Sequence, residues 1–157
     1  MNLYIVRHAH ADNGYPDSER KLRDFGRRKL IEALPHWKDY IPKVDVILTS
    51  PYKRAFETAE IIHGNYSVKE KLIVDKSLQP GINIQDVLIT LKALDKEDVM
   101  VVGHMPDVAD LVTTLTTILS PEFPFLPGSL AAIEPKFVIR KTLMTNRLIF
   151  SKGLTAM

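Results

Sequence analysis

Three short apolar runs, each followed at once by polar residues and then by a helical pattern, constrain the fold of this chain most strongly. The runs cover residues 3–6, 44–49 and 98–102. Strands that alternate with helices in this way are typical of a parallel sheet covered on both faces. In such sheets ligands bind in the crevice beyond the carboxyl ends of the strands. The polar residues directly after each run are therefore the first candidates for function.

The same alternation predicts the elements of the whole chain. We predict strands over 2–7, 44–49, 72–74 and 98–102, and helices over 25–39, 51–64, 84–94 and 107–119. In the tail we predict a stiff proline-containing loop over 120–128 and then strands over 129–134, 137–143 and 147–150, with no helices between them. The prediction is an α/β three-layer sandwich, with a mostly parallel central sheet, helices on both faces and antiparallel additions near the C-terminus. Because no segment reads as a linker, we expect one domain over residues 1–157.

Composition excludes several classes of function. The chain has 157 residues and no cysteine, which excludes thiol nucleophiles, cysteine-ligated zinc and disulfides. No apolar stretch approaches the roughly 20 residues of a membrane helix, and the N-terminus does not read as a signal peptide. We therefore expect a cytoplasmic protein with no membrane partner. A net charge of +2 does not indicate a nucleic-acid partner, and the basic residues over 20–29 read as a solvated helix face.

Each of the three strand ends carries a histidine or an arginine. Arg7 and His8 follow the first run, and Gly103 and His104 follow the third. The second run leads into Ser50 and Pro51, predicted as the N-cap and first residue of a helix whose first turn carries Arg54. A helix N-terminus favours an anion, and a guanidinium adds a planar, permanently charged fork. The sequence thus predicts a cationic site at one edge of the sheet.

At these residues the chain resembles the histidine phosphatase superfamily, with its phosphoglycerate mutase-like fold, and within it the small SixA-type phosphohistidine phosphatases. Arg7-His8-Ala9 is similar to the first motif of the family, and the segment 22–26 to a second short motif. Ser50-Pro51-x-x-Arg54-x-x-x-Thr58 and Gly103-His104 are similar to two further motifs. The likeness extends over nearly the whole chain, in order, and the short chain leaves little room for capping insertions.

The resemblance implies that His8 is the nucleophile and becomes phosphorylated, while Arg7, Arg54 and His104 hold the phosphoryl oxygens. It also implies a substrate-binding role for Arg20. These roles make physical sense, because phosphoryl transfer gains most from an aligned nucleophile and preorganised positive charge. Nearby arginines are expected to disfavour protonation of His8 and so keep it nucleophilic. Two displacements through phospho-His8 require no metal and no cofactor.

The expected substrate follows from a missing carboxylic acid. Relatives that act on alcohol phosphates usually carry a Glu between the second arginine and the late histidine, but the segment 72–81 contains none. Asp75, or Glu70 just before the segment, could replace it as general acid. A protonated imidazole leaves far more easily than an alkoxide. We therefore expect a histidine-phosphorylated signalling protein as substrate, with a small phosphorylated molecule as the alternative.

Two other classes of function stay open. His8, His10 and Asp12 have the alternating spacing by which a strand end can ligate zinc or paired metals, which would give a metal-dependent hydrolase. That hypothesis leaves Arg7 and Arg54 unexplained beside a cation. The second class is a binding module that keeps the phosphate pocket but has lost catalytic turnover. The presence of every central residue of the site argues against this class. The sequence alone leaves the roles of His10 and Asp12 undetermined.

Overall fold

The central element of the computed structural model is a five-stranded sheet with the strand order β3-β2-β4-β1-β5. The structure describes residues 1–116, 125–133, 149–150 and 155–156. The strands are β1 (Asn2–Arg7), β2 (Val46–Thr49), β3 (Ile73–Val74), β4 (Asp98–Gly103) and β5 (Leu130–Ile133). The first four are parallel, and β5 runs antiparallel beside β1 at the edge. The predicted mostly parallel sheet with an antiparallel addition is confirmed.

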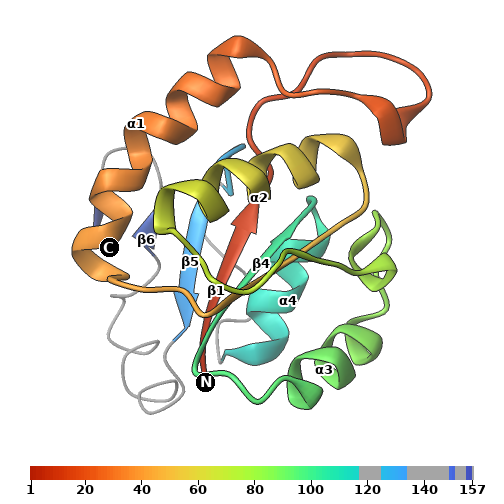
Figure 1. The fold of residues 1–157 in the computed structure, drawn as a ribbon. Helices are drawn as coiled ribbons and strands as arrows, with labels where there is room; N and C mark the ends of the chain where they lie inside the picture. The colour runs from red at the N-terminus through yellow and green to blue at the C-terminus, as the bar shows by residue number, and fades with distance from the viewer. Residues whose placement is uncertain (117–124, 134–148, 151–154, 157) are drawn as a thin grey trace.

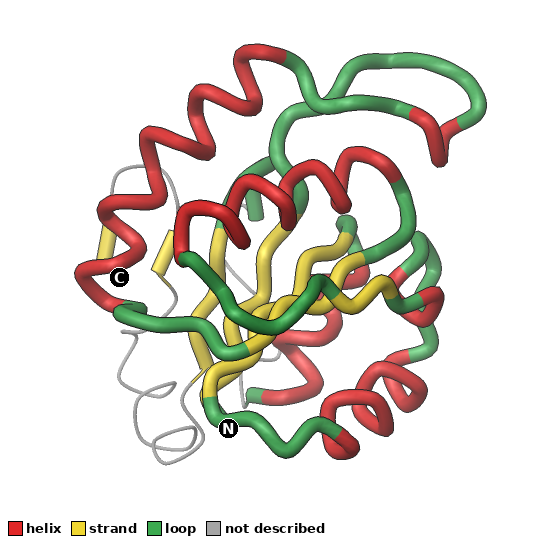
Figure 2. Tube along the Cα trace, viewed as in Figure 1, coloured by secondary structure: helices red, strands yellow, loops and turns green. Residues whose placement is uncertain are grey.

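Helices cover both faces of this sheet (Figures 1 and 2). They are α1 (Asp24–Tyr40), α2 (Lys53–Tyr66), α3 (Ile84–Ala93) and α4 (Asp107–Leu115), with short 3-10 helices η1 (Asp17–Glu19) and η2 (Lys76–Leu78). The helices α1 and α2 pack on one face, and α3 and α4 on the other. None of these helices is long and apolar enough to cross a membrane, which holds for the described part of the chain.

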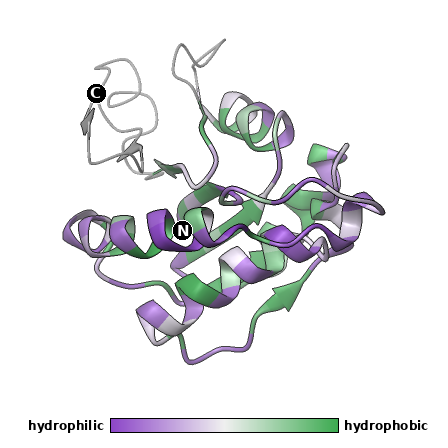
Figure 3. Cartoon of the chain, turned by 90° about the horizontal axis from the view of Figure 1, so that it is seen from above, coloured by the Kyte–Doolittle hydropathy of each residue, from purple (hydrophilic) through white to green (hydrophobic). Residues whose placement is uncertain are grey.

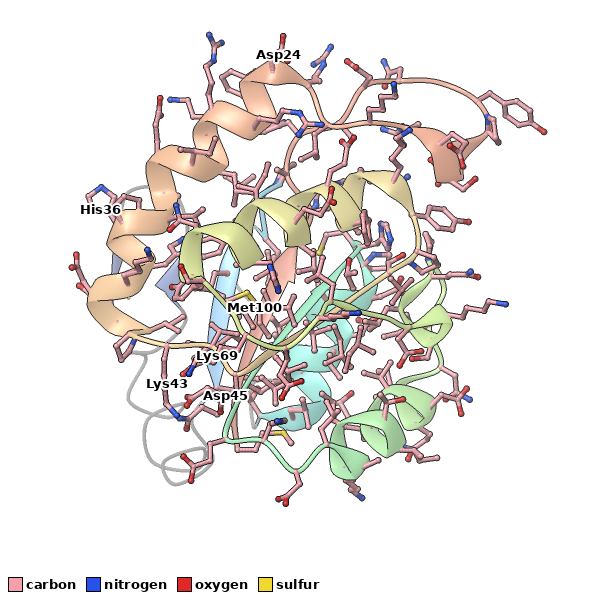
Figure 4. The ribbon with its side chains drawn as sticks, viewed as in Figure 1. Asp24, His36, Lys43, Asp45, Lys69 and Met100 are labelled. Atoms are coloured by element: carbon pink, nitrogen blue, oxygen red, sulfur yellow. The ribbon has the colours of Figure 1, made fainter. Side chains whose placement is uncertain are left out.

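The apolar runs that predicted the strands are buried on both sides. Val6, Ile47 and Met100 belong to the core under α1 and α2, while Ile5 and Val101 belong to the core under α3 and α4. This is why the runs read as continuous rather than alternating, as expected for strands of a covered parallel sheet. Figure 3 shows the hydrophobic strands between more hydrophilic outer surfaces, and Figure 4 places Met100 in the middle of the sheet.

The predicted start of the second helix is wrong by two residues. Its N-cap is Tyr52, not Ser50, and Pro51 lies before the helix. The carbonyl of Tyr52 accepts the first helical hydrogen bonds, from Ala55 and Phe56. Ser50 does not cap the helix, because its backbone N–H donates to the carbonyl of Val102 on β4 and its hydroxyl is hydrogen-bonded at the site described below. Arg54 still lies in the first turn.

The tail is described in part. Beyond β5, a two-stranded antiparallel pair joins β6 (Ile149–Phe150) to β7 (Thr155–Ala156). The predicted strand over 137–143, the end of the helix predicted to 119 and the first half of the loop predicted over 120–128 lie outside the described residues.

The connection between β1 and α1 forms a projecting loop at the carboxyl end of the sheet (Figure 1, red to orange). Its base is closed by a bridge between Ala11 and Leu22 and by a hydrogen bond from the backbone N–H of Asp12 to the carbonyl of Lys21. Gly26 lets α1 approach this base closely, since a Cβ there would lie 2.3 Å from the carbonyl oxygen of His10. Tyr15 on the loop is 97 % exposed.

Candidate active site

The strand register brings the predicted site residues to one edge of the sheet. Arg7 pairs with Gly103 across β1 and β4, and Thr49 pairs with Val102 across β2 and β4. The residues that follow these strands, His8, Ser50 and His104, therefore emerge side by side. The rings of His8 and His104 lie 5.2 Å apart, centroid to centroid, at an angle of 58°.

The backbone at His8 is held from three directions. Its N–H donates to the carbonyl of Gly103 at 3.0 Å, and its carbonyl accepts from the N–H of Gly128 at 3.0 Å. Gly128 has a φ of +77°, a conformation that favours glycine. The next N–H, of Ala9, donates to the hydroxyl of Thr58 on α2 at 3.1 Å. The position of the imidazole is thus determined by two strands, a turn and a helix.

Hydrogen bonds select one tautomer of His8. Its Nδ1 lies 2.7 Å from the carbonyl oxygen of Ala9, which can only accept, so Nδ1 carries the proton. The Nε of Arg54 lies 3.2 Å from Nε2 of His8, and a guanidinium can only donate. Nε2 is therefore unprotonated and presents its lone pair to the site.

Burial keeps this imidazole neutral. The pKa of His8 is lowered to about 4, chiefly by burial, while the bond to Ala9 raises it and the positive charges of Arg54, Arg7 and Arg20 lower it further. The lowered pKa agrees with the expectation that His8 is neutral, but its chief cause is loss of solvation, to which the arginines add.

His104 is buried, with 2 % of its surface exposed, and contacts Ser50. Its Nε2 lies 2.8 Å from the Ser50 hydroxyl, which also accepts the backbone N–H of Tyr52 at 3.2 Å. Burial, followed by the charges of His8 and Arg54, lowers the pKa of His104 to about 3, so only one ring nitrogen carries a proton. If the hydroxyl donates to Nε2, that proton is on Nδ1, which is buried and has no hydrogen-bond partner among the described residues.

Arg54 is the most heavily bonded cation of the site. It lies 5 % exposed at the start of α2, and its guanidinium lies over the ring of Tyr52 at 5.2 Å. Besides the bond to His8, its Nη1 donates to the carbonyl of Asp17 at 2.7 Å and its Nη2 to the carboxylate of Asp17 at 3.0 Å. The buried fork is therefore fixed in direction.

Two further arginines complete the cationic rim. Arg7 donates from Nη1 to the carbonyl of Phe125 at 2.7 Å, and its buried Nε has no partner among the described residues. Arg20 donates from Nε to the carbonyl of Asp12 at 2.7 Å and from Nη1 to the carboxylate of Asp17 at 2.8 Å. Asp17 thus links Arg20 to Arg54, and Arg54 in turn contacts His8.

The two carboxylates proposed as general acids lie in different places. Asp75 follows β3 at the same end of the sheet as Ser50, and its N–H donates to the carbonyl of Thr49. Its carboxylate caps η2 by accepting the N–H of Ser77 at 2.8 Å. Asp75 is therefore beside the site, with its carboxylate engaged by backbone.

Glu70 does not join the site. It precedes β3 and pairs with Lys96, which precedes β4, at 2.9 Å. Both lie at the amino ends of the strands, the region where Figure 4 labels Lys69 and Asp45. Glu70 therefore lies away from the other predicted residues, because a residue before a parallel strand lies at the edge opposite to the residues that follow it.

The ligand set of the metal hypothesis is not assembled in the described part of the chain. Asp12 forms an exposed pair with Arg23 at 3.3 Å, and the ring of His10 packs edge-on against Phe25 at 5.2 Å. No three histidine or carboxylate side chains converge there in a way that could hold a metal ion. His8, His10 and Asp12 are close in the sequence, but their side chains do not converge on a common position that a metal ion could occupy.

Sequence reasoning missed three contributors. Asp17 has no motif around it that marks it as a partner of Arg54. Thr58 was identified only as part of a motif, whereas its hydroxyl donates to the Arg54 carbonyl at 2.7 Å and also accepts the Ala9 N–H. Ser50 was assigned to the helix cap. Its place directly after β2, whose last residue Thr49 pairs with Val102, was the signal that could have linked it to His104.

Comparison with known proteins agrees with this geometry. Residues 3–79 match the model of the histidine phosphatase superfamily (branch 1). The resemblance predicted from the motifs is thereby confirmed, and with it the prediction of a phosphatase.

More particular relatives are of the SixA type. The chain is 27 % identical over 144 residues to a phosphohistidine phosphatase SixA homolog of Haemophilus influenzae, covering 85 % of this chain and 87 % of that protein. It is similar to the structure of the protein histidine phosphatase SixA complexed with tungstate, with a TM-score of 0.79, 26 % identity and coverage of 85 % and 88 %. A mycobacterial glucosyl-3-phosphoglycerate phosphatase, at 16 % identity, a TM-score of 0.63 and coverage of 85 % and 89 %, shares the fold.

Proposed function

We propose that this protein removes the phosphoryl group from phosphohistidine on a signalling protein, through a phosphohistidine intermediate on its own His8. The observation that carries the proposal is the hydrogen bonding of His8, which leaves Nε2 unprotonated beside a buried guanidinium. A cytoplasmic location is part of the proposal. The similarity to a relative described as a phosphohistidine phosphatase SixA homolog supports the substrate class.

In the first displacement, the lone pair on His8 Nε2 attacks phosphorus. The bond from phosphorus to the leaving nitrogen breaks, and its electron pair leaves with the substrate imidazole. If that ring is already protonated on its other nitrogen, it departs as a neutral base and needs no acid. The equatorial oxygens then face Arg54, Arg7 and His104, whose side chains are held at the site by the contacts described above.

In the second displacement, water attacks the phosphorus of phospho-His8. The electron pair of the phosphorus–nitrogen bond returns to Nε2, the water loses one proton to solvent, and inorganic phosphate leaves. The Nδ1 bond to Ala9 persists throughout, so His8 returns to the same tautomer. Because both displacements occur at Nε2 of His8, the same side chains bind the phosphoryl oxygens in both steps.

The position of Asp75 supports a phosphoramidate over an alkyl phosphate. An alkoxide leaving group requires a carboxylic acid with a proton to give, and general acids contribute roughly 10²–10⁴-fold. The Asp75 carboxylate already accepts the backbone N–H of Ser77, and this bond holds it at the start of η2. A small-molecule phosphomonoesterase, in which Asp75 turns to serve as acid, is the second candidate because Asp75 lies at the same edge of the sheet.

The test is phosphate release from a histidine-phosphorylated phosphotransfer domain in excess EDTA, with p-nitrophenyl phosphate as reference substrate. We expect rapid release by the native protein, a slower turnover of the aryl phosphate, and loss of both in His8→Ala. His36→Ala is the matched control, because His36 is an exposed histidine on α1. A denaturing quench at alkaline pH, where the phosphorus–nitrogen bond is stable, should trap label from labelled substrate on the native protein and not on His8→Ala.

Other outcomes identify the alternatives. Activity that EDTA abolishes would refute the metal-independent mechanism. Turnover confined to aryl or sugar phosphates would keep the nucleophile and overturn the substrate. Binding of the phosphorylated domain without any release would identify a binding module.

A further inference from the structure

The carboxylate of Asp17 lies on the cations to which the proposed function assigns the phosphoryl group. Its Oδ2 is 3.0 Å from Nη2 of Arg54, and its Oδ1 is 2.8 Å from Nη1 of Arg20. The backbone carbonyl of Asp17 is 2.7 Å from Nη1 of Arg54. With Nε of Arg54 on His8, every nitrogen of this guanidinium already has a protein partner.

Asp17 presents two oxygens to the guanidinium fork of Arg54, its Oδ2 and its backbone carbonyl, as a phosphoryl group would present two oxygens to parallel donors. Hydrogen bonds from Arg20 and Arg54 lower the pKa of Asp17, so the group is anionic at neutral pH and holds no proton to donate. Asp17 therefore does not fit the role of the missing general acid. It fits the role of an anion at an anion site.

We propose that Asp17 is an internal ligand of Arg54, which the substrate phosphoryl group must displace. The inference rests on the proposed function, since that function places the phosphoryl oxygens on Arg54. Asp17 then sets the affinity of the site for anions, because its carboxylate neutralises part of the charge of Arg54 and Arg20 and competes with any anion that binds there.

The structure allows such a displacement. The side chain of Asp17 is 52 % exposed, whereas that of Arg54 is 6 % exposed. The carboxylate lies on η1 in the projecting loop, beyond the bridge that closes the loop base. It can turn toward solvent while the buried guanidinium stays where His8 and α2 hold it. Arg20 keeps its bond to the Asp12 carbonyl and remains available to the incoming oxygens.

A positioning role for Asp17 predicts the opposite result. If Asp17 only orients Arg54, its removal loosens the fork, weakens anion binding and slows turnover. If Asp17 competes with the phosphoryl group, its removal strengthens anion binding. The sign of one affinity change therefore separates the two roles.

The experiment compares Asp17→Asn with Glu19→Gln. Both changes remove one negative charge from η1, but Glu19 is exposed and makes none of the contacts described above. Binding of inorganic phosphate is measured by calorimetry, and KM and kcat are measured with p-nitrophenyl phosphate. We expect Asp17→Asn to bind phosphate roughly two- to fivefold more tightly than Glu19→Gln, the size expected for an exposed ion pair, with a parallel fall in KM.

Phosphate affinity in Asp17→Asn that is equal to or weaker than in Glu19→Gln overturns the proposal, as does the absence of measurable binding in both. A joint loss of affinity and kcat assigns Asp17 to positioning instead. The titration with inorganic phosphate involves no turnover. It therefore gives its answer whether or not the native protein acts on phosphohistidine, and a failure of the proposed function is recognised separately.

Discussion

Replacing Ser50 by alanine should separate the part that a hydrogen bond plays in catalysis from its part in stability. Ser50 is fully buried, and its hydroxyl joins the Tyr52 N–H to Nε2 of His104. Ser50→Ala removes both bonds and adds no atom. It leaves a buried imidazole nitrogen without a partner and removes the group that can hold the ring proton on Nδ1.

The magnitudes follow from these two contacts. A buried polar group left without its partner costs about 1–3 kcal/mol, and the more accessible Tyr52 N–H should cost less, so we expect a loss of about 2–4 kcal/mol. For a protein of this size that corresponds to a fall in Tm of roughly 5–15 °C. Complete loss of an oxyanion donor slows catalysis about 10²–10³-fold. Because the ring of His104 stays in place, we expect kcat/KM to fall roughly ten- to a hundredfold.

Thr49→Val is the matched control. Thr49 is equally buried, and its hydroxyl donates to the Ser50 carbonyl at 3.2 Å without contact to His104. This variant should lose about 1 kcal/mol of stability and keep its kcat/KM. The assays are thermal unfolding, steady-state kinetics and ¹⁵N chemical shifts of the His104 ring, which report the tautomer. If Ser50→Ala keeps the kcat/KM and the ring shifts of Thr49→Val, then Ser50 serves stability alone.

Three further predictions concern pH, packing and charge. Because the pKa of His8 is lowered to about 4, kcat/KM corrected for substrate ionisation should stay level from pH 8 to 5 and fall only near pH 4; a tenfold loss by pH 5.5 would indicate an unshifted imidazole. Gly26→Ala should cost about 1–3 kcal/mol, since its Cβ would meet the backbone carbonyl of His10, whereas Gly64→Ala on α2 meets nothing and should be neutral or stabilising; equal Tm values would contradict this. Arg54→Lys should weaken phosphate binding despite the conserved charge, because an ammonium lacks the fork, and unchanged affinity in calorimetry would show that charge alone matters.

Much of the fold could be predicted because the local signals agreed. The runs at β1, β2 and β4 are mostly apolar, and each is followed by a helical pattern, so the hydrophobic pattern and the order of the elements both indicate the same α/β architecture. The strand ends then brought His8 and His104 together by register alone. The start of α2 was predicted wrongly because Ser50 fits a helix cap in sequence, while in space its hydroxyl bonds to a histidine 54 residues further along the chain.

Long-range contacts explain the remaining differences. Asp17 and Arg54 are separated by 37 residues, and nothing in the local sequence of either predicts the contact. Glu70 and Asp75 are close in sequence, but a short strand between them sends one to each edge of the sheet. Sequence proximity suggested that the two carboxylates were interchangeable, and the direction of one strand shows that they are not.

The causes of the lowered pKa of His8 indicate which features of the site keep this side chain neutral. Burial is the largest cause, and the three arginines contribute less. The neutral form of His8 thus depends mainly on the packing of β1, β4 and α2 around the ring, and in the proposed function the arginines serve to bind phosphoryl oxygens. An anion on the arginines, whether Asp17 or a phosphoryl group, would offset only their smaller share. His8 can therefore stay neutral while the negative charge beside it changes, as the proposed function requires of a nucleophile that is phosphorylated and released in each cycle.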